Sequence, residues 1–212
     1  MTHDLSSPQP EARSSRPLWK GHLIRWIVIL LLAALSFSPF WSGWSRTPEG
    51  AANRLLYGFE YPPASLVSSL AGPDRVQAAL LLDREHGLIH QVKLKRILGV
   101  LWSGSAIGIS HPMDEDIAVN MLWSINNDRR KSTYMLAGQI GDGRIASIRI
   151  AWPDGNSSEP VFAEGFYQAF HVTPLKDGEP PYRGQVELQA YDKDGKLLYE
   201  VSESNREARF ES

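Results

Sequence analysis

The sequence predicts a mainly β protein, namely an antiparallel β-sandwich-like extracytoplasmic domain preceded by one N-terminal transmembrane helix. After a single long apolar run, the chain consists of short segments in which apolar and polar residues alternate, as in half-buried strands. Asp-Gly pairs, which suit tight hairpin turns, recur between these segments. They lie at Asp142-Gly143, Asp154-Gly155, Asp177-Gly178 and Asp194-Gly195.

The N-terminal part of the chain has the layout of a membrane anchor. Residues 1–22 are rich in Ser, Pro and charge and are expected to form a disordered cytoplasmic tail. From Trp26 to Ser45 no residue is charged, and a helix of this length spans roughly 30 Å of hydrocarbon. We therefore predict a transmembrane helix over residues 23–45. Basic residues dominate before it, which places the N-terminus in the cytoplasm and the C-terminal domain outside.

Four tryptophans flank the apolar run and are predicted to be membrane-interface anchors. They are Trp19, Trp26, Trp41 and Trp44. The alternative is a cleavable signal peptide with its apolar centre over Trp26–Leu35 and cleavage after Ser36, which would release the domain. The bulky side chains and the proline after Ser36 crowd that site, and the polar leader is long. A retained signal anchor in the cell membrane is the preferred interpretation.

Residues 46–75 are expected to form a juxtamembrane connector. Pro62-Pro63 interrupts regular structure there, and the segment Ala64–Leu70 is expected to make a short helix. The β-rich domain is then expected to cover residues 76–212.

Within this domain, segments 76–82 and 88–98 flank the turn Asp83–Gly87 and predict a hairpin. Segment 117–125 is one expected strand. Segment 133–140 is expected to reverse at Gly141–Gly143 and return as 144–152. Near the C-terminus, segments 185–191 and 196–202 flank the turn Asp192–Gly195 and predict a second clear hairpin.

Composition excludes several classes of function. The chain has no cysteine, so disulfides, thiolate metal sites and cysteine nucleophiles are absent, and a bacterial extracytoplasmic domain is favoured over a eukaryotic secreted one. Residues 46–212 carry 18 basic and 22 acidic side chains. A mildly acidic domain has no electrostatic basis for binding nucleic acid.

Histidines and acidic residues supply the only hints of enzyme chemistry. His86 and His90, with Asp83 and Glu85 nearby, have the residue types of a two-histidine, one-carboxylate metal site. His111 precedes the acidic residues 114–116, which offer a general base or a cation site. The turn at Asp192 resembles the start of a calcium-binding loop, but Lys196 and Leu197 occupy ligand and glycine positions. Because exposed side chains explain these patterns more simply, no catalytic, cofactor-binding or metal-binding residue is assigned.

The segment from Pro160 to Val172 is the most aromatic part of the domain. Its aromatic residues are Phe162, Phe166, Tyr167 and Phe170. The default interpretation is that these side chains line one face of a strand and pack in the core. The alternative is that they form a partner-binding face. We expect a single-pass membrane-anchored protein whose domain acts as a binding, sensing or accessory module. Its expected partners are membrane lipid and another membrane or envelope protein. An envelope hydrolase or metal-dependent enzyme is the alternative.

Overall fold

The computed structural model describes residues 19–41, 43–72, 75–127, 130–175 and 185–210. The chain divides into two units, Met1–Pro39 and Phe40–Ser212, which are described separately. The first contains most of helix α1 (Trp19–Trp41), whose side chains are described from His22 to Phe37. Within that range, its large apolar side chains are between 47% and 65% exposed. Among the described residues, no helix is long and apolar enough to cross a membrane.

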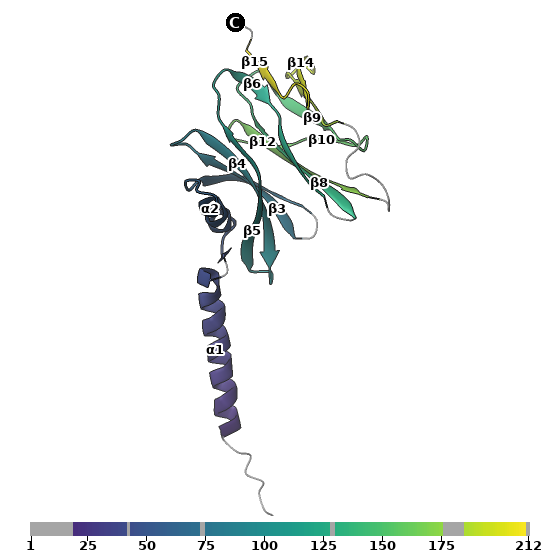
Figure 1. Cartoon of the computed structure of the whole chain (residues 1–212). Helices are drawn as coiled ribbons and strands as arrows, with labels where there is room; N and C mark the ends of the chain where they lie inside the picture. Colours follow the sequence, from purple (N-terminus) through teal and green to yellow (C-terminus); the bar gives the residue numbers. More distant parts are fainter. Residues whose placement is uncertain (1–18, 42, 73–74, 128–129, 176–184, 211–212) are drawn as a thin grey trace, which may run out of the picture. The chain divides into compact units, whose positions relative to one another are not determined.

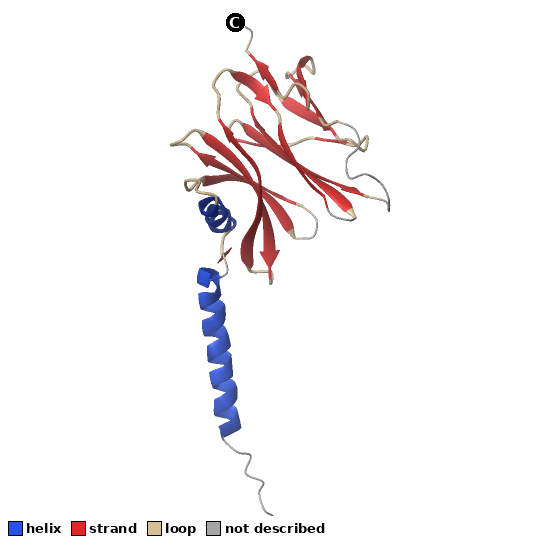
Figure 2. Ribbon diagram, viewed as in Figure 1, coloured by secondary structure: helices blue, strands red, loops and turns tan. Residues whose placement is uncertain are grey.

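The second unit is mainly β, as the sequence predicts, and its strands form several antiparallel sheets (Figure 2). One of them, the half-barrel sheet, has five strands in the order β1-β5-β4-β3-β2 and is strongly curved (Figure 1). Its strands are β1 (Trp44–Ser45), β2 (Ser65–Ala71), β3 (Val76–Asp83), β4 (Leu88–Ile97) and β5 (Leu101–Pro112).

Two further sheets have four strands each. The middle sheet, with order β11-β12-β8-β7, contains β7 (Leu122–Asn127), β8 (Lys131–Gln139), β11 (Val161–Ala163) and β12 (Phe166–Pro174). The outer sheet, with order β10-β9-β13-β14, contains β9 (Ser147–Ala151), β10 (Ser157–Ser158), β13 (Glu187–Tyr191) and β14 (Leu197–Ser202). A separate pair is formed by β6 (Ile117–Asn120) and β15 (Glu207–Arg209).

Helix α2 (Pro48–Gly58) and the three larger sheets pack as successive layers. Leu56 of α2 belongs to the same apolar cluster as Leu81 of the half-barrel sheet. Leu80, whose side chain leaves β3 on the opposite face, packs with Phe166 of the middle sheet. Tyr167, the next residue, belongs to the cluster shared with the outer sheet.

This arrangement differs from the two-sheet sandwich that the sequence favours, because the middle sheet is covered on both faces. In β8 every residue from Ser132 to Gly138 is buried. A strand buried on both faces has no reason to alternate apolar and polar residues. By contrast, β9 alternates strictly between exposed and buried residues, as expected for the outer sheet with one face in solvent.

The segment 46–75, expected to be a connector, contributes β2 and α2 to the folded unit. The expectation of a helix over Ala64–Leu70 is wrong, because Ser65–Ala71 forms strand β2 and pairs with β3. The helix lies earlier, where Thr47 caps it by accepting a 3.1 Å hydrogen bond from the backbone N–H of Gly50. Pro48 occupies the first turn, where its missing N–H costs nothing.

The two clearest hairpins are confirmed, and two other strand predictions need correction. Strands β3 and β4 pair across the turn at Asp83–Gly87, and β13 pairs with β14 across Asp192–Gly195. The expected strand 117–125 is interrupted at Met121, and its halves β6 and β7 belong to different sheets. Strands β8 and β9 do not pair, because the chain passes from the middle to the outer sheet at Gly141–Gly143.

Candidate functional site

The four aromatic residues predicted as a partner-binding face are divided between two faces of the middle sheet. Glu164 and Gly165 have positive φ angles of 52° and 79° and turn the chain, so that Phe162 pairs with Tyr167. Tyr167 is fully buried and faces the outer sheet. Phe166 is buried against the half-barrel sheet, and Phe170 is half-buried beside Gly72. Of the four, Phe162 is the most exposed, at 46%.

The three histidines that suggested an enzyme do not converge. His86 lies in the β3–β4 turn, where its Nδ1 is 2.8 Å from a carboxylate oxygen of Asp83. His90 is completely buried. His111 pairs in register with Ile89 and therefore points to the opposite face of the half-barrel sheet from His90. No three His, Asp or Glu side chains in the described ranges group as a metal ion would require.

The acidic residues 114–116 form an ordered loop. Asp114 accepts a 2.9 Å hydrogen bond from the backbone N–H of Asp116, and it pairs with Arg209 at 2.8 Å. The hydrogen bond from Asp116 is the largest cause of the lowered pKa of Asp114; desolvation opposes it, and Arg209 lowers the pKa further. The side-chain amide of Gln139 bonds both the N–H and the carbonyl of Asp114. These contacts give the loop a structural role.

The four tryptophans predicted as interface anchors have different surroundings. Trp26 is 62% exposed on α1. Trp44 is half-buried in β1, where it pairs with Ser103, and its carbonyl accepts a hydrogen bond from Arg54. Trp19 and Trp41 belong to α1, but their side chains lie outside the described residues. Of the two indoles that the structure describes, that of Trp26 is exposed and that of Trp44 is half-buried.

An exposed aromatic group lies at the C-terminal end of α2, within the segment expected to be a connector. We call it the α2 patch, and it consists of Tyr57, Phe59, Tyr61, Pro62 and Pro63. Tyr57 is 82% exposed and Phe59 is 60% exposed. The local signal in the sequence is the stretch "YGFEYPP", in which three aromatic residues and two prolines occur within seven positions.

The way α2 ends explains why these rings are exposed. The N–H of Tyr61 donates to the carbonyl of Leu56 at 3.0 Å, and the N–H of Glu60 donates to the carbonyl of Tyr57 at 3.1 Å. This is a Schellman motif, which requires a left-handed residue, and Glu60 supplies it with a φ of 64°. Leu56 and Tyr61 close the motif by packing into the apolar cluster beneath α2, while Tyr57 and Phe59 remain outside.

A shallow hollow of about 630 Å³ adjoins the α2 patch and is lined by residues 57, 58 and 60–63. Beneath Tyr61 lies His90, with 5.1 Å between the ring centroids. Burial lowers the pKa of His90, an effect that the Asp83 carboxylate partly opposes, so the ring is neutral near pH 7. Its Nδ1 is 3.0 Å from the hydroxyl oxygen of Ser110, and its buried Nε2 has no hydrogen-bond partner in the described structure.

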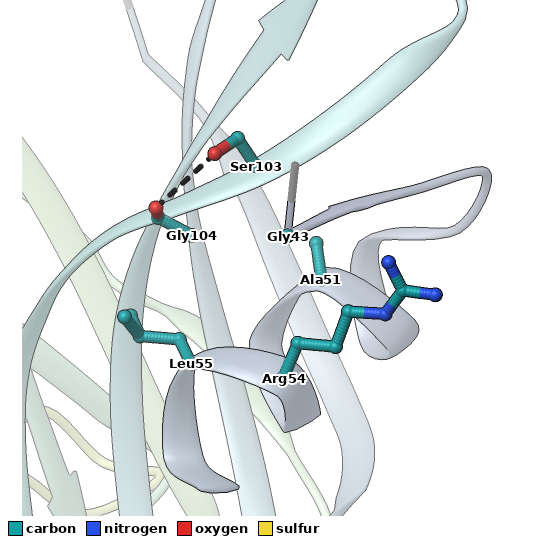
Figure 3. Close-up of a pocket in the computed structure, with 6 residues that line it drawn as sticks. All are labelled: Gly43, Ala51, Arg54, Leu55, Ser103 and Gly104. Atoms are coloured by element: carbon teal, nitrogen blue, oxygen red, sulfur yellow. Dashed lines mark hydrogen bonds between the residues drawn. The ribbon is translucent and has the colours of Figure 1, made fainter. Parts of the chain in front are cut away.

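A second, smaller cavity of about 160 Å³ lies between α2 and β5 (Figure 3). At this place Gly104 allows the helix to approach β5 closely. A Cβ at this position would lie 2.7 Å from the Cβ of Leu55 and 3.2 Å from the carbonyl oxygen of Ala51. Its lining offers one charged side chain, Arg54, whose guanidinium also bonds the carbonyl of Trp44. We assign this cavity to helix packing.

A polar cluster joins the middle and outer sheets. Nε2 of His171 and the hydroxyl of Thr173, both on β12, contact one carboxylate oxygen of Asp154 at 2.8 and 3.0 Å. The imidazole of His171 stacks on the indole of Trp152, with 4.8 Å between ring centroids and 12° between ring planes. The Trp152 N–H donates to the hydroxyl of Ser158 at 2.9 Å. We interpret these contacts as a structural tie between the two sheets.

Comparison with known proteins identifies no matching protein family, no similar curated protein and no similar solved structure.

Proposed function

We propose that this protein is a membrane-attached, non-enzymatic binding module. In this proposal α1 holds the chain in the cell membrane, and the β domain is presented outside to a protein of the same membrane or envelope. The observation that carries the proposal is the exposure of large apolar side chains along the described part of α1, in which no residue from Trp26 to Phe37 is charged. The residues concerned are Leu23, Ile24, Trp26, Ile27, Val28, Ile29, Leu30, Leu31, Leu32, Leu35 and Phe37.

Water is an unfavourable environment for such a helix. A helix on the surface of a soluble protein keeps one polar face, whereas a helix that is apolar on all sides requires a fully apolar environment. Beyond Phe37 the sequence stays uncharged as far as Ser45. Lipid hydrocarbon supplies that environment, and four basic against two acidic residues in 1–25 favour a cytoplasmic N-terminus.

The α2 patch is the partner-binding surface in this proposal. Aromatic residues are enriched at protein interfaces, where they combine a large apolar area with few rotatable bonds. Tyr57 and Phe59 are held in place by the Schellman motif beneath them, so binding costs little backbone entropy. If both partners are held in one membrane, their effective concentration is high, and a small interface suffices.

Membrane attachment is tested by alkaline extraction of membranes from cells that express the full chain. The wild type is expected to stay in the pellet with an intact N-terminus by mass spectrometry. The double variant Leu30→Lys, Leu31→Lys is expected to move to the supernatant, while Leu197→Lys, at an exposed site on β14, behaves as wild type. Complete extraction of the wild type, or a mature chain beginning near Phe37, would refute a retained anchor.

Partner binding is tested with a photo-crosslinking amino acid at single positions in the same membranes. A defined crosslinked product is expected from Tyr57 and is expected to disappear when Phe59→Ser is added. Phe162, which is also partly exposed, is the matched control. If Phe162 gives the product and Tyr57 does not, the interface lies on the middle sheet and the α2 patch is the wrong surface.

A further inference from the structure

The turn between β4 and β5 exposes two large apolar side chains. Leu98 is 68% exposed and Val100 is 67% exposed, while their neighbour Leu101 is only 6% exposed. We call residues 98–100 the hairpin tip. Leu101 already fills the adjacent core, so the tip side chains contribute little to folding. They are a small apolar surface that the described structure leaves open to solvent.

The backbone of the tip makes this choice of residues more unusual. Leu98 has a φ of 51° and Gly99 a φ of 75°, and the N–H of Val100 donates to the carbonyl of Ile97 at 3.2 Å. Two consecutive left-handed residues are typical of hairpin turns built on Asn-Gly or Asp-Gly. A bulky side chain in this region of conformational space is strained. Leucine is thus unfavourable at position 98 in two respects. Its backbone conformation is strained, and its apolar side chain is exposed to water.

Basic side chains surround the tip. Every charged residue within the stretches 43–48, 75–76 and 93–103 is basic. Lys95 and Arg96 lie near the end of β4. The N–H of Arg96 donates to the carbonyl of Arg75 at 3.0 Å, so Arg75, just before β3, lies beside them. Arg46 follows β1, whose Ser45 pairs with Trp102 of β5. Two acidic residues adjoin these stretches in the sequence: Glu49, whose carboxylate accepts a hydrogen bond from the backbone N–H of Leu66, and Asp74, which lies outside the described residues.

This concentration of positive charge contrasts with the rest of the domain. Residues 46–212 as a whole carry more acidic than basic side chains. Arg46, Arg75, Lys95 and Arg96 form no ion pair with a carboxylate in the described structure. Arg96 instead lies over the ring of Trp102, 5.4 Å from its centroid. Their charge is therefore available to an external anionic surface.

We infer that the hairpin tip docks into the headgroup region of an anionic bilayer. Leu98 and Val100 enter the boundary between headgroups and acyl chains, while the four basic side chains contact lipid phosphates, as in other interfacial anchors that combine apolar residues with a basic rim. This inference rests on the proposed membrane attachment. Chain connectivity is consistent with it, because two residues separate the end of α1 from β1, and β1 pairs with β5 close to the tip.

Docking would give the domain a fixed orientation on the membrane. A domain tethered only through a short linker samples many orientations. In most of them its binding surface does not face a partner. A second contact with the lipid restricts this motion and keeps the α2 patch at a fixed distance from the bilayer. The effective concentration of the patch for a partner in the same membrane therefore rises.

The test uses the full chain, which has no cysteine and therefore accepts a single labelled one. Val100→Cys is labelled with an environment-sensitive fluorophore, and the protein is reconstituted into vesicles of phosphatidylcholine with or without phosphatidylglycerol. Bromine-labelled lipids then report contact by quenching. Leu30→Cys reports insertion of α1, and Leu197→Cys on β14 is the exposed control.

Strong quenching at position 100 in anionic vesicles, weaker quenching in neutral vesicles and none at position 197 are expected. Adding Leu98→Asn is expected to lower the ratio of docked to free tips by about tenfold or more. Adding Lys95→Gln or Arg75→Gln is expected to lower it by about fivefold each. Quenching at position 100 that equals that at position 197, or that does not depend on lipid charge, overturns the inference.

The two proposals fail in distinguishable ways. Quenching at position 30 without quenching at position 100 leaves the anchor intact and refutes tip docking. Absence of quenching at position 30 refutes the anchor, and position 100 then still decides whether the tip contacts anionic lipid.

Discussion

The hydroxyl of Tyr167 donates a 2.5 Å hydrogen bond to the backbone carbonyl of Asn120. Tyr167 is completely buried on β12, and Asn120, at the end of β6, is 2% exposed. Burial raises the pKa of Tyr167 well above its ordinary value, so the hydroxyl keeps its proton and remains a donor at any ordinary pH. This bond ties the separate β6–β15 pair to the middle sheet.

Tyr167→Phe removes that donor and leaves a buried carbonyl oxygen without this partner. Such a loss is expected to reduce the free energy of unfolding by about 1–3 kcal/mol. Urea denaturation followed by tryptophan fluorescence measures it, with the protein in detergent micelles. Tyr57→Phe, which changes a highly exposed ring, is the control and is expected to be neutral. Equal stability of the two variants would show that the bond contributes nothing.

A substitution at Gly138 tests the packing of the same region. A Cβ on Gly138 would lie 2.2 Å from the carbonyl oxygen of Asn120 and 2.6 Å from the ring of Tyr167. Neither atom has room to move, because both belong to the buried core. Gly138→Ala is therefore expected to destabilise the domain by about 3 kcal/mol or more. Gly143→Ala, where a Cβ would meet nothing within 4 Å, should remain close to wild type in thermal unfolding.

Much of the fold could be predicted from local patterns. The β3–β4 and β13–β14 hairpins follow from alternating strands on either side of recognisable turns. The capping sequence Thr47-Pro48-Glu49 is also a local signal for α2, although the helix expected in this part of the chain, over Ala64–Leu70, lies after Pro63. By contrast, the stacking of three sheets depends on which faces are buried. Strands such as β8, which are buried on both faces, do not reveal their partners.

The candidate sites illustrate the same limit. The Asp154–His171 contact joins the turn between β9 and β10 to strand β12, 17 positions further along the chain, and no spacing rule predicts it. Phe162 and Phe166 were expected to share a face on one strand. The turn at Glu164-Gly165 separates them. The exposure of Tyr57 and Phe59 depends on the Schellman motif that ends α2. In this motif a glutamate, Glu60, occupies the position usually held by glycine.

Leu98 provides a stability test that is independent of any membrane. Because Leu98 adopts a left-handed conformation, Leu98→Asn is expected to raise the free energy of unfolding by about 0.5–1 kcal/mol. Leu197→Asn, at an exposed position in the regular strand β14, is the control and is not expected to stabilise. Urea denaturation in micelles compares the two. A destabilised Leu98→Asn would mean that Leu98 packs within the fold, and the docking inference would lose its premise.

The Asp154–His171 tie predicts a specific dependence of stability on pH. Partial burial raises the pKa of Asp154, but hydrogen bonds from His171, Asn156 and Thr173 outweigh it and hold this pKa at about 2. A folded-state pKa below the ordinary value of 3.8 means that the ionised carboxylate stabilises the folded protein. This contribution is complete above the ordinary pKa and is lost as the pH falls through about 2.

Asp154→Asn removes the charge while keeping an oxygen that accepts the hydrogen bond from the backbone N–H of Asn156. The variant is expected to be less stable than wild type by about 1 kcal/mol near pH 6, since the lost bonds involve a charged group. The difference should shrink as the pH falls from about 4 to about 2, because the carboxylate is protonated near pH 3.8 in the unfolded chain but only near pH 2 in the folded protein. Asp194→Asn is a matched control, since Asp194 also precedes a glycine with positive φ. Denaturation curves at a series of pH values measure both variants. A difference that persists unchanged at low pH would show that Asp154 acts through the shape of its turn and not through its charge.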